Sequence, residues 1–306
     1  MNAVKTWINT ELQQKPSIFS KAIVEAACTC FFVFIGLGAN SSKILTRQYM
    51  GIDVQLAWAS GIGMGVLMGS RVSGPHINPA VSFMFLVQKK MSLSHCLVYC
   101  FAQTFGAFIA AAMIFGIYYD ALNAFDGGIR TIHGANATGL MFSSFPQDYL
   151  SLTNGLFDQV ANTAVLCIGV KALTDKKADI HILLHPFIII TFIFLIVSSL
   201  SLNAGSSINP ARDFGPRLFM LLAGYDWEVF SYNNYKWWWV PIVGPMTGGV
   251  VGGIWYDLCI GYHMPDLSIR NINRTRTFIE PIFEVQPDDE EADYSDNNTV
   301  DDKIST

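Results

Sequence analysis

The segment NAGSSINPARDFGPR occupies residues 203–217, and the related segment VSGPHINPAVSF occupies residues 72–83. Both contain Ile-Asn-Pro-Ala after a run rich in Gly and Ser. Asn is a favourable helix N-cap, and Pro fits the first helical position because its missing N–H would have no partner there. The pattern therefore predicts that Asn78 and Asn209 each cap a short helix, ending near Val87 and Leu222.

The Asn side chains are the candidate functional groups of these two segments. If each side-chain carbonyl accepts the cap hydrogen bonds, each amide NH2 is left free with a fixed direction. The helix N-terminus adds partial positive charge at the same place. One Asn-Pro-Ala tripeptide would indicate only a turn and a helix start. Two copies between long apolar segments predict two oriented donors that meet inside one membrane pore.

The composition indicates a membrane protein. Of the 306 residues, 51% are hydrophobic and only 14% are charged, which is well below the charge content of soluble domains. Many apolar runs are long enough to cross a bilayer. We expect an all-α protein with six transmembrane helices, near residues 20–40, 52–69, 93–119, 154–173 and 184–202, with a sixth ending near residue 260.

The two halves of the chain repeat. Glu25 precedes Asn78 by nearly the same distance as Asp158 precedes Asn209, and each half holds three spans. Three spans per half give an inverted repeat whose site lies where the broken helices meet. The non-helical backbone of residues 72–77 and 202–208 should then line a water-filled path with carbonyl groups.

The repeat sets the predicted domain boundaries. We expect a channel domain over residues 19–261, with repeats at about 19–120 and 153–261. A cytoplasmic N-terminal segment, residues 1–18, precedes it. A cytoplasmic tail, residues 262–306, follows it; residues 286–306 contain eight Asp or Glu and one Lys, a composition typical of disorder.

The distribution of Lys and Arg predicts the orientation. If the N-terminus is cytoplasmic, eleven basic residues fall on the inner side and four on the outer side, which favours both termini inside. The tripeptide Asn136-Ala137-Thr138 then lies outside, where it would be an N-glycosylation sequon. The three Trp residues at 237–239 are expected at the headgroup interface.

These features closely resemble the major intrinsic protein family, the aquaporins, over about residues 19–261. Four segments resemble the animal aquaglyceroporin subgroup, with Asp213 directly after Arg212 as its marker: NPARDFGPRLF (209–219), FGIYYDAL (115–122), NGLFDQ (154–159) and WWWVPIVGP (237–245). The resemblance implies an integral membrane protein of the plasma membrane that forms a homotetramer with one pore per subunit. It implies that two pore motifs line each pore: Asn78, Pro79, Ala80 and Asn209, Pro210, Ala211.

The resemblance also implies a selectivity filter formed by Trp58, Val197, Ser206 and Arg212. Water-selective members usually carry His where this chain has Val197, so a polar contact that restricts the pore to water is missing. Glycerol-conducting relatives, however, usually have Gly at that position and often an aromatic residue at the position of Ser206. Two buried acids, Glu25 and Asp158, are expected to support the motifs, with Gln159 as the alternative to Asp158.

The predicted function is a passive channel for glycerol, small uncharged polyols and water, with urea as a further candidate solute. Arg212 would donate hydrogen bonds to the permeant, Trp58 would face its carbon atoms, and Arg212 with the half-helix dipoles would exclude ions and protons. The alternative is a water-selective pore narrowed by Val197. A second interpretation of Arg212 is a buried ion pair with Glu25 or Asp158.

Other function classes have less support. A structural junction protein with a vestigial pore would carry a long adhesive outer loop, and a coupled transporter would carry more paired charges within its spans. An enzyme is not expected, since no nucleophile–base set, phosphate loop or metal cluster stands out. The sequence predicts no cofactor, no metal site and no nucleic-acid partner, only solutes and the lipid bilayer.

Overall fold

The computed structural model describes residues 16–48 and 51–265, and every regular element in these ranges is a helix. Most of the predicted N-terminal segment and nearly all of the predicted acidic tail lie outside the described residues. The helices are α2 (Ile18–Thr46), α3 (Ile52–Gly69), α4 (Pro79–Val87), α5 (Leu93–Ile117), α6 (Tyr119–Asp126), α7 (Leu152–Thr174), α8 (His185–Leu200), α9 (Pro210–Leu222), α10 (Glu228–Tyr235) and α11 (Val240–Cys259). Short 3-10 turns lie at Gly139–Met141, Lys176–Ala178, Ile182–Leu184 and Gly261–His263.

Six long helices, three in each half of the chain, correspond to the six spans expected from the sequence. By length and composition, α2, α3, α5, α7 and the segment Ile182–Leu200 that contains α8 are each able to cross a bilayer. The sixth long helix is α11, which has 20 residues with glycine recurring along it. A Cβ atom at Gly248 or Gly252 would overlap backbone oxygens of α7, so these glycines allow the two helices to pack at close range.

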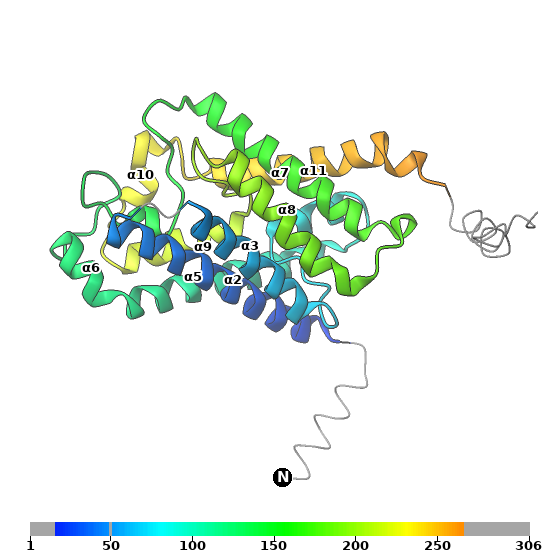
Figure 1. Cartoon of the computed structure of the whole chain (residues 1–306), viewed down its shortest axis with the longest axis horizontal. Coiled ribbons are helices and arrows are strands. Elements are labelled where there is room, and N and C mark those ends of the chain that lie inside the picture. The colour runs from blue at the N-terminus through cyan, green and yellow to red at the C-terminus, as the bar shows by residue number, and fades with distance from the viewer. Residues whose placement is uncertain (1–15, 49–50, 266–306) are drawn as a thin grey trace, which may run out of the picture. The chain divides into compact units, whose positions relative to one another are not determined.

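The two halves have the same order of elements. Helices α2, α3, α4 and α5 form one half, and α7, α8, α9 and α11 form the other; in each, a short helix follows two long ones and precedes a third. Figure 1 shows α5 beside α2 and α11 beside α7, and these pairs make the most extensive contacts within each half. Between the halves, α4 packs on α11 and α9 packs on α5, while α3 packs on α8. This reciprocal packing is the inverted repeat expected from the sequence.

The structure confirms the ends of both short helices, since α4 ends at Val87 and α9 at Leu222. It adds helices in two connections that the sequence left as loops: α6 follows α5 almost directly, and α10 lies between α9 and α11. The expectation that all three tryptophans lie at the headgroup interface is wrong for Trp237. Its side chain is buried, and its Nε1 donates to the carbonyl oxygen of Ser144 at 3.0 Å.

Candidate functional site

Both Asn residues cap their short helices as the sequence predicts. Asn78 and Asn209 have extended backbones, and a Pro follows each at the start of its helix. Asn78 Oδ1 accepts from the N–H of Ala80 at 2.9 Å. Asn209 Oδ1 accepts from the N–H groups of Ala211 and Arg212 at 3.0 and 3.3 Å. The cap bonds therefore fix the direction of both amide groups.

The two amides join the halves of the molecule. Asn78 Nδ2 donates to the carbonyl oxygen of Ile208 at 2.9 Å, and Asn209 Nδ2 donates to that of Ile77 at 2.8 Å. The expectation that each NH2 is left wholly free is therefore wrong, because one N–H of each is used in this reciprocal contact. An amide NH2 has two donors, and the described residues supply no partner for the second one on either side chain.

The residues before the two Asn are conformationally strained. Ile77 has φ 45° and Ile208 has φ 32°, a region that β-branched residues rarely adopt. Their carbonyl groups are the ones that accept from the Asn amides. Strain of this kind persists only when the surrounding contacts over-determine the conformation, and it clusters at functional sites.

Glu25 holds the first of these loops and faces the bundle interior, as expected for a carboxylate within a span. The residue is completely buried. Its Oε1 accepts from the N–H of His76 at 3.0 Å, and its Oε2 accepts from the N–H of Ile77 at 2.8 Å. Gln103 Nε2 also donates to Oε2 at 2.8 Å. These bonds fix the backbone just before Asn78.

The second loop is supported differently from the first. The expectation that Asp158 is a buried acid is wrong, and the alternative residue, Gln159, is the buried one. Asp158 is half-buried, whereas the next residue, Gln159, is fully buried. Gln159 Nε2 donates to the carbonyl oxygen of Gly205 at 3.2 Å and to Asp158 Oδ2 at 2.9 Å. Asp158 Oδ1 accepts from Asn203 Nδ2 at 2.8 Å. A neutral amide thus takes the buried position beside this loop and the acid stays partly exposed, which avoids the cost of burying a carboxylate there.

One cavity of about 620 Å³ brings the predicted site together. Asn78, Asn209 and residues 74–77 and 204–208 of the two loops line it. The four predicted filter residues also line it, namely Trp58, Val197, Ser206 and Arg212. Both His185 and Val197 contribute, and they lie near the beginning and the end of α8. The cavity therefore follows the length of a membrane-spanning helix.

Arg212 is held by a carbonyl group and an aromatic ring. Its Nη1 donates to the carbonyl oxygen of Phe142 at 2.9 Å, and its Cζ lies 4.4 Å from the centroid of the Trp58 ring. No ion pair in residues 16–48 and 51–265 includes Arg212, so the interpretation as a partner of Glu25 or Asp158 is wrong. The remaining N–H groups of the guanidinium can serve another acceptor.

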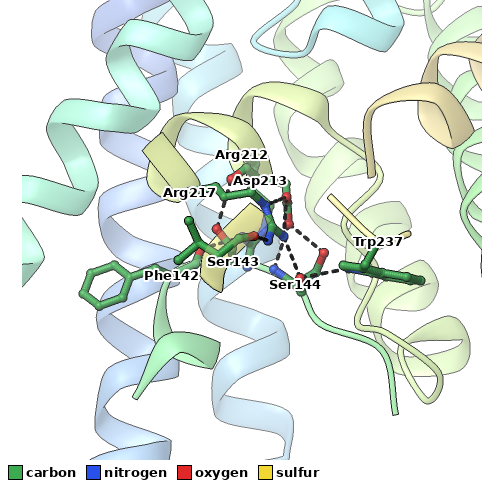
Figure 2. Close-up of polar contacts among 8 residues, drawn as sticks. Phe142, Ser143, Ser144, Arg212, Asp213, Arg217 and Trp237 are labelled. Atoms are coloured by element: carbon green, nitrogen blue, oxygen red, sulfur yellow. Dashed lines mark hydrogen bonds and ion pairs between the residues drawn. The ribbon is translucent and has the colours of Figure 1, made fainter. Parts of the chain in front are cut away.

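Asp213 anchors the segment that holds Arg212 (Figure 2). Its Oδ2 accepts from the N–H and the hydroxyl of Ser144 at 2.7 and 2.6 Å, and its Oδ1 accepts from Nε and Nη2 of Arg217 at 3.0 and 2.8 Å. Arg217 Nη2 also donates to the carbonyl oxygen of Ser144 at 2.7 Å. Because Phe142 lies two residues before Ser144, this brace positions the carbonyl that accepts from Arg212.

Several residues of the site were not identified from the sequence. Arg217 lies four residues after Asp213 on α9, and this spacing typical of helical ion pairs could have indicated it. Nothing in the sequence marks the cavity-lining residues Asn40 and Ser201, or Phe142 and Ser144 in the connection between α6 and α7. Their roles depend on contacts between segments far apart in the chain.

The predicted glycosylation sequon has a mixed environment. Asn136 is exposed, and its Oδ1 accepts from Arg47 Nη2 at 2.7 Å. Thr138 is buried, donates to Asp126 Oδ2 at 3.1 Å and accepts from the Tyr225 hydroxyl at 2.7 Å. Thr138 thus contributes to the packing of the connection between α6 and α7, and glycosylation of Asn136 stays a prediction.

Comparison with known proteins agrees with this geometry. The model of the family described as major intrinsic protein matches residues 12–256. The chain is 41% identical to aquaporin-9 of Homo sapiens, over 82% of this chain and 86% of that protein. It is 38% identical to aquaporin-9 of Mus musculus, over 85% of this chain and 89% of that protein.

A solved structure shares the fold. The X-ray structure of the aquaglyceroporin from Plasmodium falciparum superposes with a TM-score of 0.71 at 28% identity, covering 79% of this chain and 96% of that one. Together with the paired Asn-capped half-helices and the cavity between them, these similarities identify the chain as an integral membrane protein. It belongs to the major intrinsic protein family, which is a family of membrane channels.

Proposed function

We propose that this protein is a passive channel for glycerol, other small uncharged polyols and water, and that it excludes ions and protons. The observation that carries the proposal is the single cavity that contains both Asn-capped helix N-termini, Arg212 and Trp58. The named relatives, an aquaporin-9 and an aquaglyceroporin, support the same solute class. A water-selective pore, the alternative suggested by Val197, has no comparable support.

The lining can replace the hydration of a polyol. A permeant oxygen can accept from Arg212 and from the second N–H of Asn78 or Asn209, while Trp58 presents an apolar face to the carbon atoms. Loop carbonyls accept from the permeant hydroxyl groups. Since each hydrogen bond to water is exchanged for one to the protein, the net cost of dehydration is small.

Charge exclusion follows from the same groups. Arg212 carries a full positive charge in the lining, and the N-termini of α4 and α9 each contribute partial positive charge beside the Asn amides. No Asp or Glu is among the described residues that line the cavity, so a cation or a hydrated proton there would meet these positive charges. The four residues Trp58, Val197, Ser206 and Arg212 form the filter in this proposal, and Asp213 positions it.

The assembly and orientation belong to the same proposal. The channel domain comprises residues 19–261, both termini are cytoplasmic, the protein resides in the plasma membrane and Asn136 is glycosylated outside. Exposed apolar side chains on the spans, among them Phe101, Phe187 and Leu195, suit contact with lipid or with neighbouring copies in a homotetramer.

Stopped-flow light scattering of proteoliposomes tests the proposal. Vesicles with the protein should shrink faster than empty vesicles in a sucrose gradient and re-swell faster in a glycerol gradient. Fast shrinkage without faster re-swelling would make the protein a water pore and refute the polyol part. Shrinkage no faster than in empty vesicles would refute the channel itself.

A further inference from the structure

Two polar residues of the cavity lie directly behind filter side chains. Ser201 is at the C-terminal end of α8 and contacts Ser206, and Asn40 is in the last part of α2 and contacts Trp58. Both line the cavity, although neither belongs to the four filter residues predicted from the sequence. Their hydrogen bonds determine what Ser206 and Trp58 present to a permeant.

The serine pair has a defined proton arrangement. Ser201 Oγ lies 2.6 Å from the carbonyl oxygen of Val197 and 2.9 Å from Ser206 Oγ. A carbonyl oxygen can only accept, so the single hydroxyl proton of Ser201 must point to Val197. The contact between the two serines then requires Ser206 to donate to Ser201. With its proton engaged, Ser206 Oγ has only lone pairs to offer to the cavity, and it acts there as an acceptor.

The indole of Trp58 is fixed at its nitrogen and on its face. Trp58 Nε1 donates to Asn40 Oδ1 at 3.2 Å. A Cβ atom at Gly36 would overlap the indole, so the ring rests against the backbone of α2 at this glycine. The Cζ atom of Arg212 lies over the ring, 4.4 Å from its centroid. The bond to Asn40 therefore fixes the rotation of the ring within its slot and keeps its flat face aligned with the guanidinium.

We propose that Ser201 and Asn40 are positioning residues that determine the specificity of the filter for solutes with hydroxyl groups. The inference rests on the proposed function, because it requires the filter to lie in the solute path. Ser201 gives the filter a fixed acceptor at Ser206, and Arg212 supplies the donor. Asn40 holds the apolar wall of Trp58. A hydroxyl group both donates and accepts, so a polyol matches these groups, whereas an ether lacks the proton that Ser206 requires.

The first test concerns Ser201, with glycerol and water permeability measured on the same proteoliposomes. Ser201→Ala releases the Ser206 hydroxyl and should lower the ratio of glycerol to water permeability by about fivefold, the effect of roughly one net hydrogen bond. Ser201→Thr keeps the hydroxyl and should show the same ratio of glycerol to water permeability as the unmodified protein. Thr191→Ala is the matched control, since Thr191 makes the same kind of bond, to the Phe187 carbonyl, on the exposed side of α8.

The outcomes separate this inference from the proposed function. If the unmodified protein passes glycerol and Ser201→Ala leaves the permeability ratio unchanged or raised, the role of Ser201 is refuted while the channel stands. If the unmodified protein passes water but no glycerol, the polyol part of the proposed function is refuted before any Ser201 variant is compared. A ratio lowered equally by Ser201→Ala and Thr191→Ala would also refute the inference, because a general effect on α8 would explain it.

The second test is a double-mutant cycle on Asn40 and Trp58. Asn40→Leu should lower the permeability ratio about fivefold in the unmodified background. It should have no further effect in Trp58→Phe, which keeps an aromatic wall but has no N–H for Asn40 to accept. Equal effects in both backgrounds would refute positioning through Trp58. Asn40→Asp keeps an acceptor oxygen for Trp58 Nε1 and should retain the permeability ratio. This variant serves as the test if the leucine variant does not fold.

Discussion

Replacing Asp213 with asparagine tests the brace that positions Arg212. The Asp213 carboxylate is fully buried and accepts four hydrogen bonds, two from Ser144 and two from Arg217, whose guanidinium is also buried. Asn has one acceptor oxygen, so its NH2 group would face donors of Ser144 or Arg217. The variant would also leave the charge of Arg217 without its partner, at a cost of about 3–5 kcal/mol.

The assay is thermal unfolding of the purified protein in detergent, followed by intrinsic fluorescence. A loss of this size corresponds to a fall in Tm of about 10 °C for a chain of this length. Glu228→Gln is the matched control, because Glu228 pairs with His133 at the exposed surface and its loss should change stability by no more than about 0.5 kcal/mol. A Tm for Asp213→Asn equal to that of the control would refute the reasoning.

Three further predictions concern the pore. Gly36→Ala should push the Trp58 ring into the cavity and lower both water and glycerol permeability in stopped-flow measurements. In the control Gly116→Ala the added Cβ meets open space, so neither permeability should change. Equal permeability in the two variants would contradict the packing of Trp58 against Gly36. Arg212→Val should admit protons or cations, measured with a pH-sensitive dye inside the vesicles, and unchanged exclusion would remove Arg212 from the filter. Asn78→Asp keeps the cap acceptor but loses the donor to the Ile208 carbonyl, so it should destabilise the protein by about 1–3 kcal/mol. A Tm equal to that of the unmodified protein would argue against this contact between the two loops.

Local chemistry explains what the sequence could predict. Asn followed by Pro favours a helix start through local interactions, and the ends of α4 and α9 at Val87 and Leu222 agree with the predicted ends. The repeat of Asn-Pro-Ala predicted that both caps belong to one site, and the reciprocal bonds of Asn78 and Asn209 place them together.

Contacts between distant segments explain what the sequence could not predict. The bond from Arg212 to Phe142 and the brace at Ser144 join residues about seventy positions apart, and no periodicity encodes that distance. The exchange of roles between Asp158 and Gln159 depends on the rotation of α7, which a sequence window does not define to one residue. The same limit applies to Trp237. The run of three tryptophans at 237–239 indicates the headgroup interface, whereas the structure buries the indole of Trp237.

The most direct test of the central claim is the uptake of labelled glycerol by proteoliposomes with and without an imposed sodium or proton gradient. A passive polyol channel predicts uptake faster than in empty vesicles, with the same final level, equal to the outside concentration, under every gradient. Uptake no faster than in empty vesicles, or accumulation above the outside concentration when a gradient is present, would contradict it.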